Sequence, residues 1–214
     1  VTVPAIVDLR RFRQPFVHTV LEPDGTFVEL ETGPGTMTWT YLEDVSPFLV
    51  HAVLSHEDSR FFTHAGFSPP HIRNALVKNL QQGRYAVGAS TITMQLVKNI
   101  FLRREKTLAR KTQEVLLTWW IERVMEKRDI LELYLNVIEY GPDIYGVRKA
   151  AHYYFGKPPW HLSAAESAFI MGLKPYPRAG HRQWQSQTLN AWWRKRVRNV
   201  MRAAGQGAAG SGPL

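Results

Sequence analysis

The sequence predicts a mainly α-helical fold with a small N-terminal β-hairpin. Apolar residues recur at helical spacing from Tyr41 onward, whereas two short runs with β-strand character surround a turn sequence near the N-terminus. With 214 residues the chain has the length of one domain with a sizeable core. Its longest apolar run, residues 115–121, is far shorter than the ~20 residues that a membrane-spanning helix needs.

The hairpin and the first helix have clear local signals. The hairpin is predicted over residues 16–30, where Pro23-Asp24-Gly25 forms the turn and glycine supplies the positive φ. Ser46 followed by Pro47 is typical of a helix cap and first turn, and this helix is predicted to end at about Asp58.

Further helices follow in order. They are predicted near residues 70–82, 91–102 and 107–125, from a cap at Asp129 to Gly141-Pro142, over residues 144–155 before Gly156, from the capping box Ser163-x-x-Glu166 to Gly172, and over residues 189–202. We therefore divide the chain into an N-terminal extension with the hairpin (1–40), a main domain (41–202) and a flexible tail (203–214) that is poor in apolar residues.

The chain is strongly basic, with 27 Lys and Arg against 18 Asp and Glu. This balance favours an anionic partner such as a phosphorylated substrate, an acidic membrane surface or nucleic acid, without choosing among them. The absence of Cys excludes disulfides, Cys-ligated zinc and thiol nucleophiles. Because the chain begins with Val and shows no signal peptide, we expect a fragment whose anchor segment lies outside the numbered residues.

Glu57 is a candidate for proton transfer. It continues an apolar helical stripe made by Val50, Val53 and Leu54. Desolvation by these neighbours is predicted to raise the pKa of its carboxyl group toward the range that is useful in proton transfer. A lone glutamate at a helix end is more often simply solvated, so this interpretation depends on the residues around it.

The helix predicted over residues 91–102 begins as phosphate-binding helices do. Small residues lead into a first turn that carries free backbone donors and the positive end of the helix dipole. One face collects polar side chains, namely Thr91, Gln95, Lys98 and Asn99, and the other collects Ile92, Leu96 and Ile100. A merely solvated helix face has the same pattern, so this alternative stays open.

Five segments of the chain form an ordered set of motifs. They are Glu57-Asp58-x-x-Phe61-x-x-His64-x-Gly66, Gly88-Ala89-Ser90-Thr91-Ile92-Thr93-Met94-Gln95-Leu96-Val97-Lys98-Asn99, Arg110-Lys111-x-x-Glu114, Lys127-x-x-Ile130-Leu131-x-x-Tyr134-Leu135-Asn136, and Tyr154-Phe155-Gly156-Lys157. In sequence and order they resemble the motifs of the family 51 peptidoglycan glycosyltransferases, which occur as monofunctional enzymes and in class A penicillin-binding proteins. The resemblance implies a lysozyme-like fold and the polymerisation of lipid II into glycan strands with release of undecaprenyl diphosphate.

The resemblance also implies residue roles. The catalytic residues would be Glu57, as the base, and Glu114. The substrate-binding residues would be Ser90, Thr91, Gln95, Lys98, Asn99, Lys106, Arg110 and Lys111, of which Lys98, Lys106 and Arg110 would neutralise the departing diphosphate. The supporting residues would be Asp58, His64 and Asn136, for which local turn, capping and bracing contacts are the alternative. A divalent cation, Mg²⁺ or Mn²⁺, is the candidate cofactor at Glu114, and no organic cofactor is expected.

The chain departs from the family pattern at two positions. Met94 stands where many members have Gln, and Arg73 precedes the position where the family usually has Arg, which is Asn74 here. One position along a helix turns a side chain by about 100°. These departures support one alternative, a degenerate domain that binds lipid or glycan without catalysis.

A second alternative is a lysozyme-like hydrolase in which Glu57 is the general acid. No Ser is followed three residues later by Lys, so the nucleophile motif of transpeptidases is absent. The expected partners are lipid II, the growing glycan strand, a membrane surface that the basic and aromatic last helix would meet, and cell-wall synthesis proteins, but not nucleic acid. The expected location is the extracytoplasmic face of the bacterial inner membrane.

Overall fold

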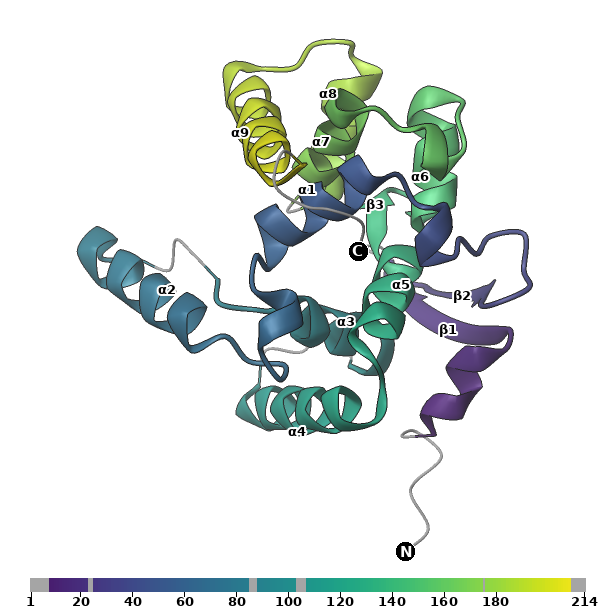
Figure 1. Ribbon diagram of the computed structural model, residues 1–214, viewed down its shortest axis with the longest axis vertical. Helices are drawn as coiled ribbons and strands as arrows, with labels where there is room; N and C mark the ends of the chain where they lie inside the picture. The colour runs from purple at the N-terminus through teal and green to yellow at the C-terminus, as the bar shows by residue number, and fades with distance from the viewer. Residues whose placement is uncertain (1–7, 23–24, 85–87, 103–106, 175, 209–214) are drawn as a thin grey trace, which may run out of the picture.

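The computed structural model describes residues 8–22, 25–84, 88–102, 107–174 and 176–208 (Figure 1). Its helices are α1 (Pro47–Glu57), α2 (Pro69–Gln82), α3 (Ile92–Phe101), α4 (Leu108–Val124), α5 (Lys127–Val137), α6 (Val147–Phe155), α7 (Ala164–Leu173), α8 (Pro177–Gln185) and α9 (Ala191–Ala208). Its strands are β1 (Phe16–Leu21), β2 (Phe27–Thr32), β3 (Glu139–Gly141) and β4 (Ile144–Tyr145). The mainly α-helical prediction is confirmed.

The N-terminal hairpin lies where it was predicted, and Pro23 and Asp24 of its predicted turn lie outside the described residues. Strands β1 and β2 pair antiparallel in a register that sets Phe16 opposite Thr32 and Leu21 opposite Phe27. Gly25 has φ +87°, the positive angle that the turn sequence predicted.

Most helix boundaries agree with the sequence signals. Pro47 lies in the first turn of α1, and the capping box of Ser163 and Glu166 opens α7 with both of its hydrogen bonds present. Gly156 ends α6 in the left-handed region at φ +64°.

Some predicted elements were wrong. Helix α6, predicted from residue 144, begins at Val147. Helix α5 begins at Lys127 after Glu126, so Asp129 lies in its first turn and is not its cap. The helix also ends at Val137, and the next residues form the short β3–β4 hairpin, whose turn includes Asp143 at φ +58°. Helix α8 after Tyr176 was not predicted.

The last helix is longer than predicted. Helix α9 begins at Ala191 and ends at Ala208, so residues 203–208 are helical although we assigned them to a flexible tail. Extending an existing helix avoids the cost of nucleation, and this stretch is rich in alanine, the best helix former. Residues 209–214 lie outside the described residues.

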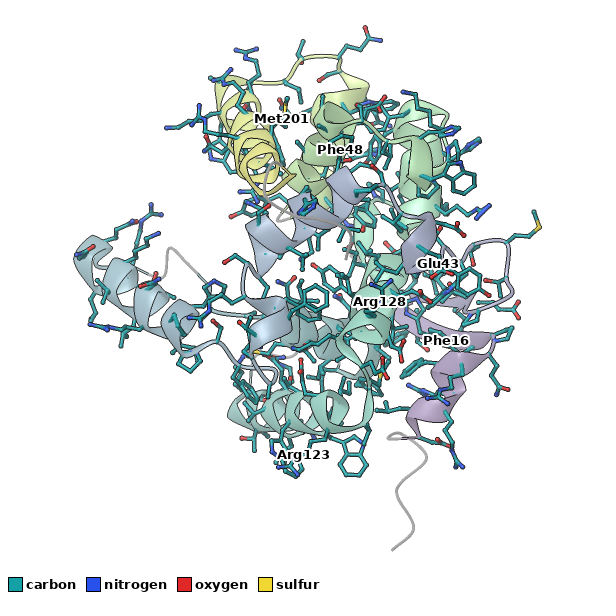
Figure 2. All side chains as sticks on the ribbon, in the orientation of Figure 1. Phe16, Glu43, Phe48, Arg123, Arg128 and Met201 are labelled. Atoms are coloured by element: carbon teal, nitrogen blue, oxygen red, sulfur yellow. The ribbon has the colours of Figure 1, made fainter. Side chains whose placement is uncertain are left out.

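One core joins the hairpin region to the helices. Phe12, Phe16 and Trp39 pack in the same buried cluster as residues of α1, α3, α5, α6 and α7 (Phe16 is labelled in Figure 2). Trp39 also donates its indole N–H to Glu132 of α5 at 3.0 Å. The predicted boundary after Thr40 therefore does not separate two cores.

The helices form two groups. Helix α3 packs against α4 and α5, and α1, α7 and α9 pack against one another (Figure 1). Helix α2 projects away from the remaining helices in the same view. None of the helices within the described ranges combines the length and the apolar character that crossing a membrane requires.

Candidate active site

Glu57 lies where the ends of three helices meet. It is the last residue of α1, and its Oε2 accepts hydrogen bonds from Gln95 Nε2 of α3 at 2.8 Å and from Lys174 Nζ, just after α7, at 2.9 Å. The side chains of Glu57 and Lys174 are only 13% and 11% exposed. The site therefore contains a nearly buried carboxylate–ammonium pair.

The pair changes the expected ionisation of Glu57. Burial alone would raise the pKa of its carboxyl group, but the positive charge of Lys174 and the hydrogen bonds from Gln95 and Lys174 outweigh burial, so the pKa lies below its ordinary value. The prediction of a raised pKa was wrong, because the apolar stripe on α1 ends opposite a cation. Glu57 is consequently ionised at neutral pH.

Gln95 connects both members of the pair to the core. Its amide N–H₂ donates to Glu57, and its Oε1 accepts from the Lys174 ammonium and from the Tyr134 hydroxyl, the latter at 3.3 Å. Tyr134 is fully buried, and burial raises the pKa of its hydroxyl well above the ordinary value, so it remains a donor. These bonds fix the Gln95 amide orientation.

Asp58 holds the first motif against the start of α3. Its fully buried carboxylate contacts His64 Nε2 at 2.9 Å and accepts from the Ile92 backbone N–H at 3.2 Å. Asp58 thus caps α3, because an acceptor at a helix N-terminus satisfies a free donor and a negative charge there suits the dipole. The supporting role of Asp58 and His64 toward substrate stays a prediction.

The start of α3 differs from the expected phosphate site. Thr91 is fully buried, donates its hydroxyl to the Gly66 carbonyl at 2.7 Å, and accepts from the Met94 N–H at 3.3 Å. Since Asp58 and Thr91 occupy two of the first-turn donors, Thr91 acts as a cap and does not face an open site.

The rest of α3 has the apolar face and the polar face that the residue spacing predicted. Ile92, Leu96 and Met94 are buried, so Met94 is a core residue. Lys98 and Ser90 are exposed, and Asn99 donates to the Gln95 carbonyl at 2.9 Å. The polar face thus runs from the nearly buried Gln95 to the exposed Lys98.

Glu114 lies on α4 and is neutralised there. It is 3% exposed and pairs with Arg110 at 2.7 Å and with Lys111, one turn before it. The described partners of Glu57 are Gln95 and Lys174, so the two carboxylates share none of these partners. They are connected through the packing of α3 against α4.

Two cations neutralise Glu114, the residue at which a divalent cation was expected. Among the described residues there is no group of three or more His, Cys, Asp or Glu side chains that could hold a metal ion. Mg²⁺ or Mn²⁺ at Glu114 stays a prediction.

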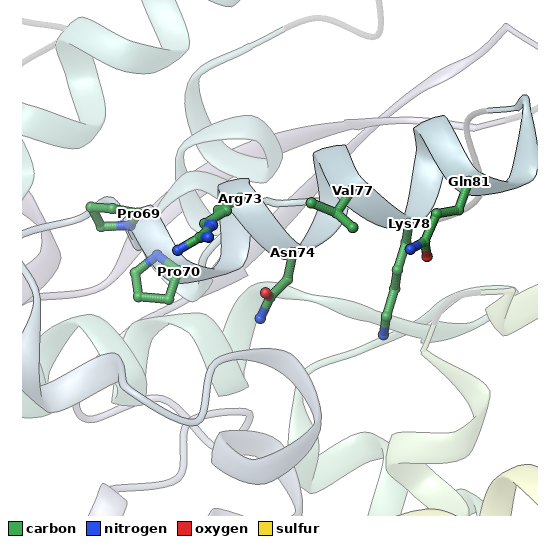
Figure 3. A pocket seen from close by; sticks show the side chains of 7 residues that line it. All are labelled: Pro69, Pro70, Arg73, Asn74, Val77, Lys78 and Gln81. Atoms are coloured by element: carbon green, nitrogen blue, oxygen red, sulfur yellow. The ribbon is translucent and has the colours of Figure 1, made fainter.

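The remaining predicted residues lie elsewhere. Asn136 is buried and braces the loop before α1, because its side chain exchanges hydrogen bonds with the Thr40 backbone at 2.9 and 2.8 Å. Lys106 falls outside the described residues. Arg73 and Asn74 both line a hollow of ≈ 660 Å³ along α2 (Figure 3), so the shifted arginine still borders the same space.

Sequence reasoning missed Lys174 and Arg196. Lys174 follows an apolar helix, where a basic residue is ordinary because it suits the C-terminal end of the dipole. Arg196 is one of several cations on α9, yet its guanidinium contacts His56 Nε2 and donates to the Gly172 carbonyl at 3.0 Å. Neither position carries a local signal that separates it from a surface cation.

Comparison with known proteins agrees with the motifs. A family model described as Transglycosylase matches residues 25–204. A biosynthetic peptidoglycan transglycosylase of Acinetobacter baumannii is 41% identical over 159 residues, which cover 74% of this chain and 70% of the relative. Proteins of the same name from Nitrosospira multiformis and Nitrosomonas eutropha are 38% identical over 187 residues (87% and 78% covered) and 46% identical over 151 residues (71% and 62% covered).

Proposed function

The chain belongs to the transglycosylase family and is a peptidoglycan transglycosylase, and we propose that it extends glycan strands by an inverting transfer with Glu57 as general base. The donor is lipid II, whose disaccharide-pentapeptide is carried on undecaprenyl diphosphate, and the acceptor is a sugar 4-hydroxyl. The observation that carries the proposal is the nearly buried Glu57 carboxylate, which Lys174 keeps ionised and Gln95 holds in place.

The proposed step transfers one proton to Glu57 and one glycosyl group to the acceptor oxygen. Glu57 removes the proton of the 4-hydroxyl while that oxygen attacks the anomeric carbon of the donor. The bond from this carbon to the diphosphate oxygen breaks, and undecaprenyl diphosphate leaves with the electron pair. General-base assistance contributes typically ~10²–10⁴ in rate, and orientation of the two substrates supplies much of the remainder.

Cations on α3 and α4 support the leaving-group side of the proposal. Lys98 is exposed on the polar face of α3, and Arg110 has a buried Nε without a partner among the described residues. A buried N–H of this kind is costly unless an acceptor reaches it. A diphosphate oxygen is such an acceptor, whereas glycan hydrolysis releases no diphosphate. The unsatisfied Nε of Arg110 therefore favours transfer over the hydrolase alternative.

The direct test is polymerisation of lipid II by Glu57→Gln protein. We expect the rate to fall by about 10²-fold or more, since the amide cannot take the proton. Glu43→Gln is the matched control, because Glu43 is an exposed glutamate outside the site (Figure 2). A folded Glu57→Gln protein that polymerises at near-normal rate would exclude Glu57 as the base.

The same assay separates the alternatives for the whole chain. Release of soluble fragments from finished peptidoglycan by the unaltered protein indicates a hydrolase. If the protein binds lipid II but makes no glycan from it, with or without Mg²⁺ and Mn²⁺, the chain is a degenerate binding domain.

We also propose that the chain acts at the extracytoplasmic face of the inner membrane, beside cell-wall synthesis proteins. Two surfaces support contact with a membrane. Four exposed cations of α9, Arg194, Lys195, Arg198 and Arg202, lie opposite its buried Trp193 and Val200. Helix α2 exposes Ile72, Leu76 and Leu80. Sedimentation with vesicles tests this, and binding should rise with the fraction of anionic lipid and weaken with salt.

A further inference from the structure

Two exposed aromatic rings lie next to each other just after the end of α7, where Lys174 also lies. Tyr176 follows Lys174 by two residues, and its backbone N–H donates to the Leu173 carbonyl at 3.0 Å. Trp192 lies in the first turn of α9, and its ring centroid is 6.0 Å from that of Tyr176. The two residues are 59% and 49% exposed. They come from different segments, so their proximity is a product of the fold.

The rings are held by residues that also surround Glu57. Trp192 meets the buried Trp193 edge-on at 4.7 Å, and the Arg196 guanidinium lies 5.6 Å from the Trp192 ring centroid. Arg196 is in turn fixed to the Gly172 carbonyl and to His56, the neighbour of Glu57. Glu57 and Tyr176 both act electrostatically on Arg196.

We propose that Tyr176 and Trp192 form a saccharide subsite that is continuous with the catalytic pair and binds a pyranose ring of the β-linked N-acetylhexosamine chain. The proposal rests on the proposed function, which it deepens. Aromatic faces with a few fixed polar groups beside them are typical of ligand sites. The C–H face of a pyranose packs on such rings, while its hydroxyl and acetamido groups meet polar partners such as Arg196.

The geometry of α9 favours a sugar over a lipid surface as the occupant. The exposed cations Arg194, Lys195, Arg198 and Arg202 lie on the face opposite Trp193 and Val200. Trp192 lies instead at the edge of that face, about 100° before Trp193 and on the side of Arg196. Tyr176 is not on α9 at all. The two rings therefore contact each other, Trp192 contacts Arg196, and neither ring is part of the cationic set on α9.

Titration with chitohexaose, a soluble β-1,4-linked N-acetylglucosamine hexamer, tests the subsite by calorimetry. We expect Trp192→Ala and Tyr176→Ala each to weaken binding by about fivefold, the loss typical of one aromatic contact. Trp160→Ala is the matched control, because Trp160 is 45% exposed and also has an arginine, Arg148, at 5.7 Å from its ring. Its affinity should stay within a factor of two of the unaltered protein.

Three results would overturn the subsite. They are no binding by the unaltered protein, equal weakening in Trp160→Ala, and unchanged affinity in the Trp192 and Tyr176 variants. Trp192→Phe guards against a folding artefact, since the smaller ring should retain most of the affinity. A Trp192→Ala protein that loses binding to phosphatidylglycerol vesicles but not to chitohexaose would assign the ring to the membrane and refute the proposal.

Failure of the subsite and failure of the proposed function give different results. Chitohexaose binding that depends on Trp192, in a protein that makes no glycan from lipid II, supports the subsite and refutes the polymerase. Glycan synthesis that depends on Glu57, together with chitohexaose binding that is unchanged in the Trp192 and Tyr176 variants, supports the polymerase and refutes the subsite.

Discussion

At the scale of single residues, Lys174 keeps Glu57, the proposed general base, ionised. Glu57 is nearly buried, and burial disfavours its charged form. The ammonium at 2.9 Å reverses that balance and leaves a carboxylate able to accept a proton. Lys174 is thus a positioning residue, and its removal should alter the pH range of activity as well as the rate.

Replacing Lys174 with Met should move the acidic limb of the pH–rate profile to higher pH. Burial then acts on Glu57 without the opposing charge, so its pKa rises and a higher pH is needed to ionise it. The profile is measured as residual kcat/KM for lipid II polymerisation. Lys174→Arg keeps the charge and should retain the original midpoint. An unchanged midpoint in the Met variant would show that Lys174 does not control Glu57.

The sequence predicted Glu57 and Gln95 but not their cationic partner. Glu57 ends an apolar stripe, and Gln95 lies on the polar face of an amphipathic helix, so both had local signals. Lys174 lies 117 positions from Glu57, and no periodicity within one helix reports a contact of that range. The sign of the Glu57 pKa shift therefore required the fold.

At the scale of elements, Asp58 stabilises the start of α3. Asp58→Ala should lower the free energy of unfolding by about 3 kcal/mol, because it leaves the buried Ile92 N–H and His64 without their acceptor. Urea denaturation measures the change. Asp129→Ala, at an exposed position in the first turn of α5, should cost about 0.5 kcal/mol. Equal losses in the two variants would contradict the capping role of Asp58.

His18 should make the hairpin sensitive to acid. Burial, aided by the charge of Arg11, lowers the pKa of His18 from its ordinary 6.5 to about 4. The unfolded chain therefore binds a proton first, and the free energy of unfolding falls as pH drops from 6.5 toward 4, by about 3 kcal/mol in total. His18→Leu should reduce this slope in urea titrations across that range. His152→Leu, an exposed control on α6, should leave the slope unchanged.

Elements with local caps were predictable, and those set by tertiary contacts were not. Ser46-Pro47 and Ser163-x-x-Glu166 carry their own start signals, and both helices begin there. The sequence instead predicted helix up to Gly141-Pro142 and again from residue 144, yet β3 and β4 pair there because the turn at Asp143 reverses the chain. Tertiary packing overrides a weak local preference in such short segments.

At the scale of the whole molecule, Arg178 joins three distant segments. From α8 it pairs with Glu22 at the end of the N-terminal hairpin and with Glu139 of β3, the latter at 3.0 Å. Tyr145 of β4 adds a hydrogen bond to Glu22 at 2.7 Å. One guanidinium therefore balances two largely buried carboxylates.

Arg178→Met should destabilise the protein by about 2 kcal/mol and lower its Tm. The loss comes from two carboxylates left without their cation in a partly shielded site. Arg182→Met, one turn along the same helix and exposed, should change stability by less than about 0.5 kcal/mol. Thermal melts followed by circular dichroism compare the two, and a similar Tm for both would contradict the joining role of Arg178.

The long distance in sequence between Glu57 and Lys174 also affects when the site is completed during synthesis. During synthesis Glu57 emerges more than a hundred residues before its partner, and closing so long a loop is entropically costly until the intervening helices have packed. Arg196, which anchors the last helix beside the pair, is made later still. The proposed site is therefore complete only after the segments that carry Lys174 and Arg196 have been made.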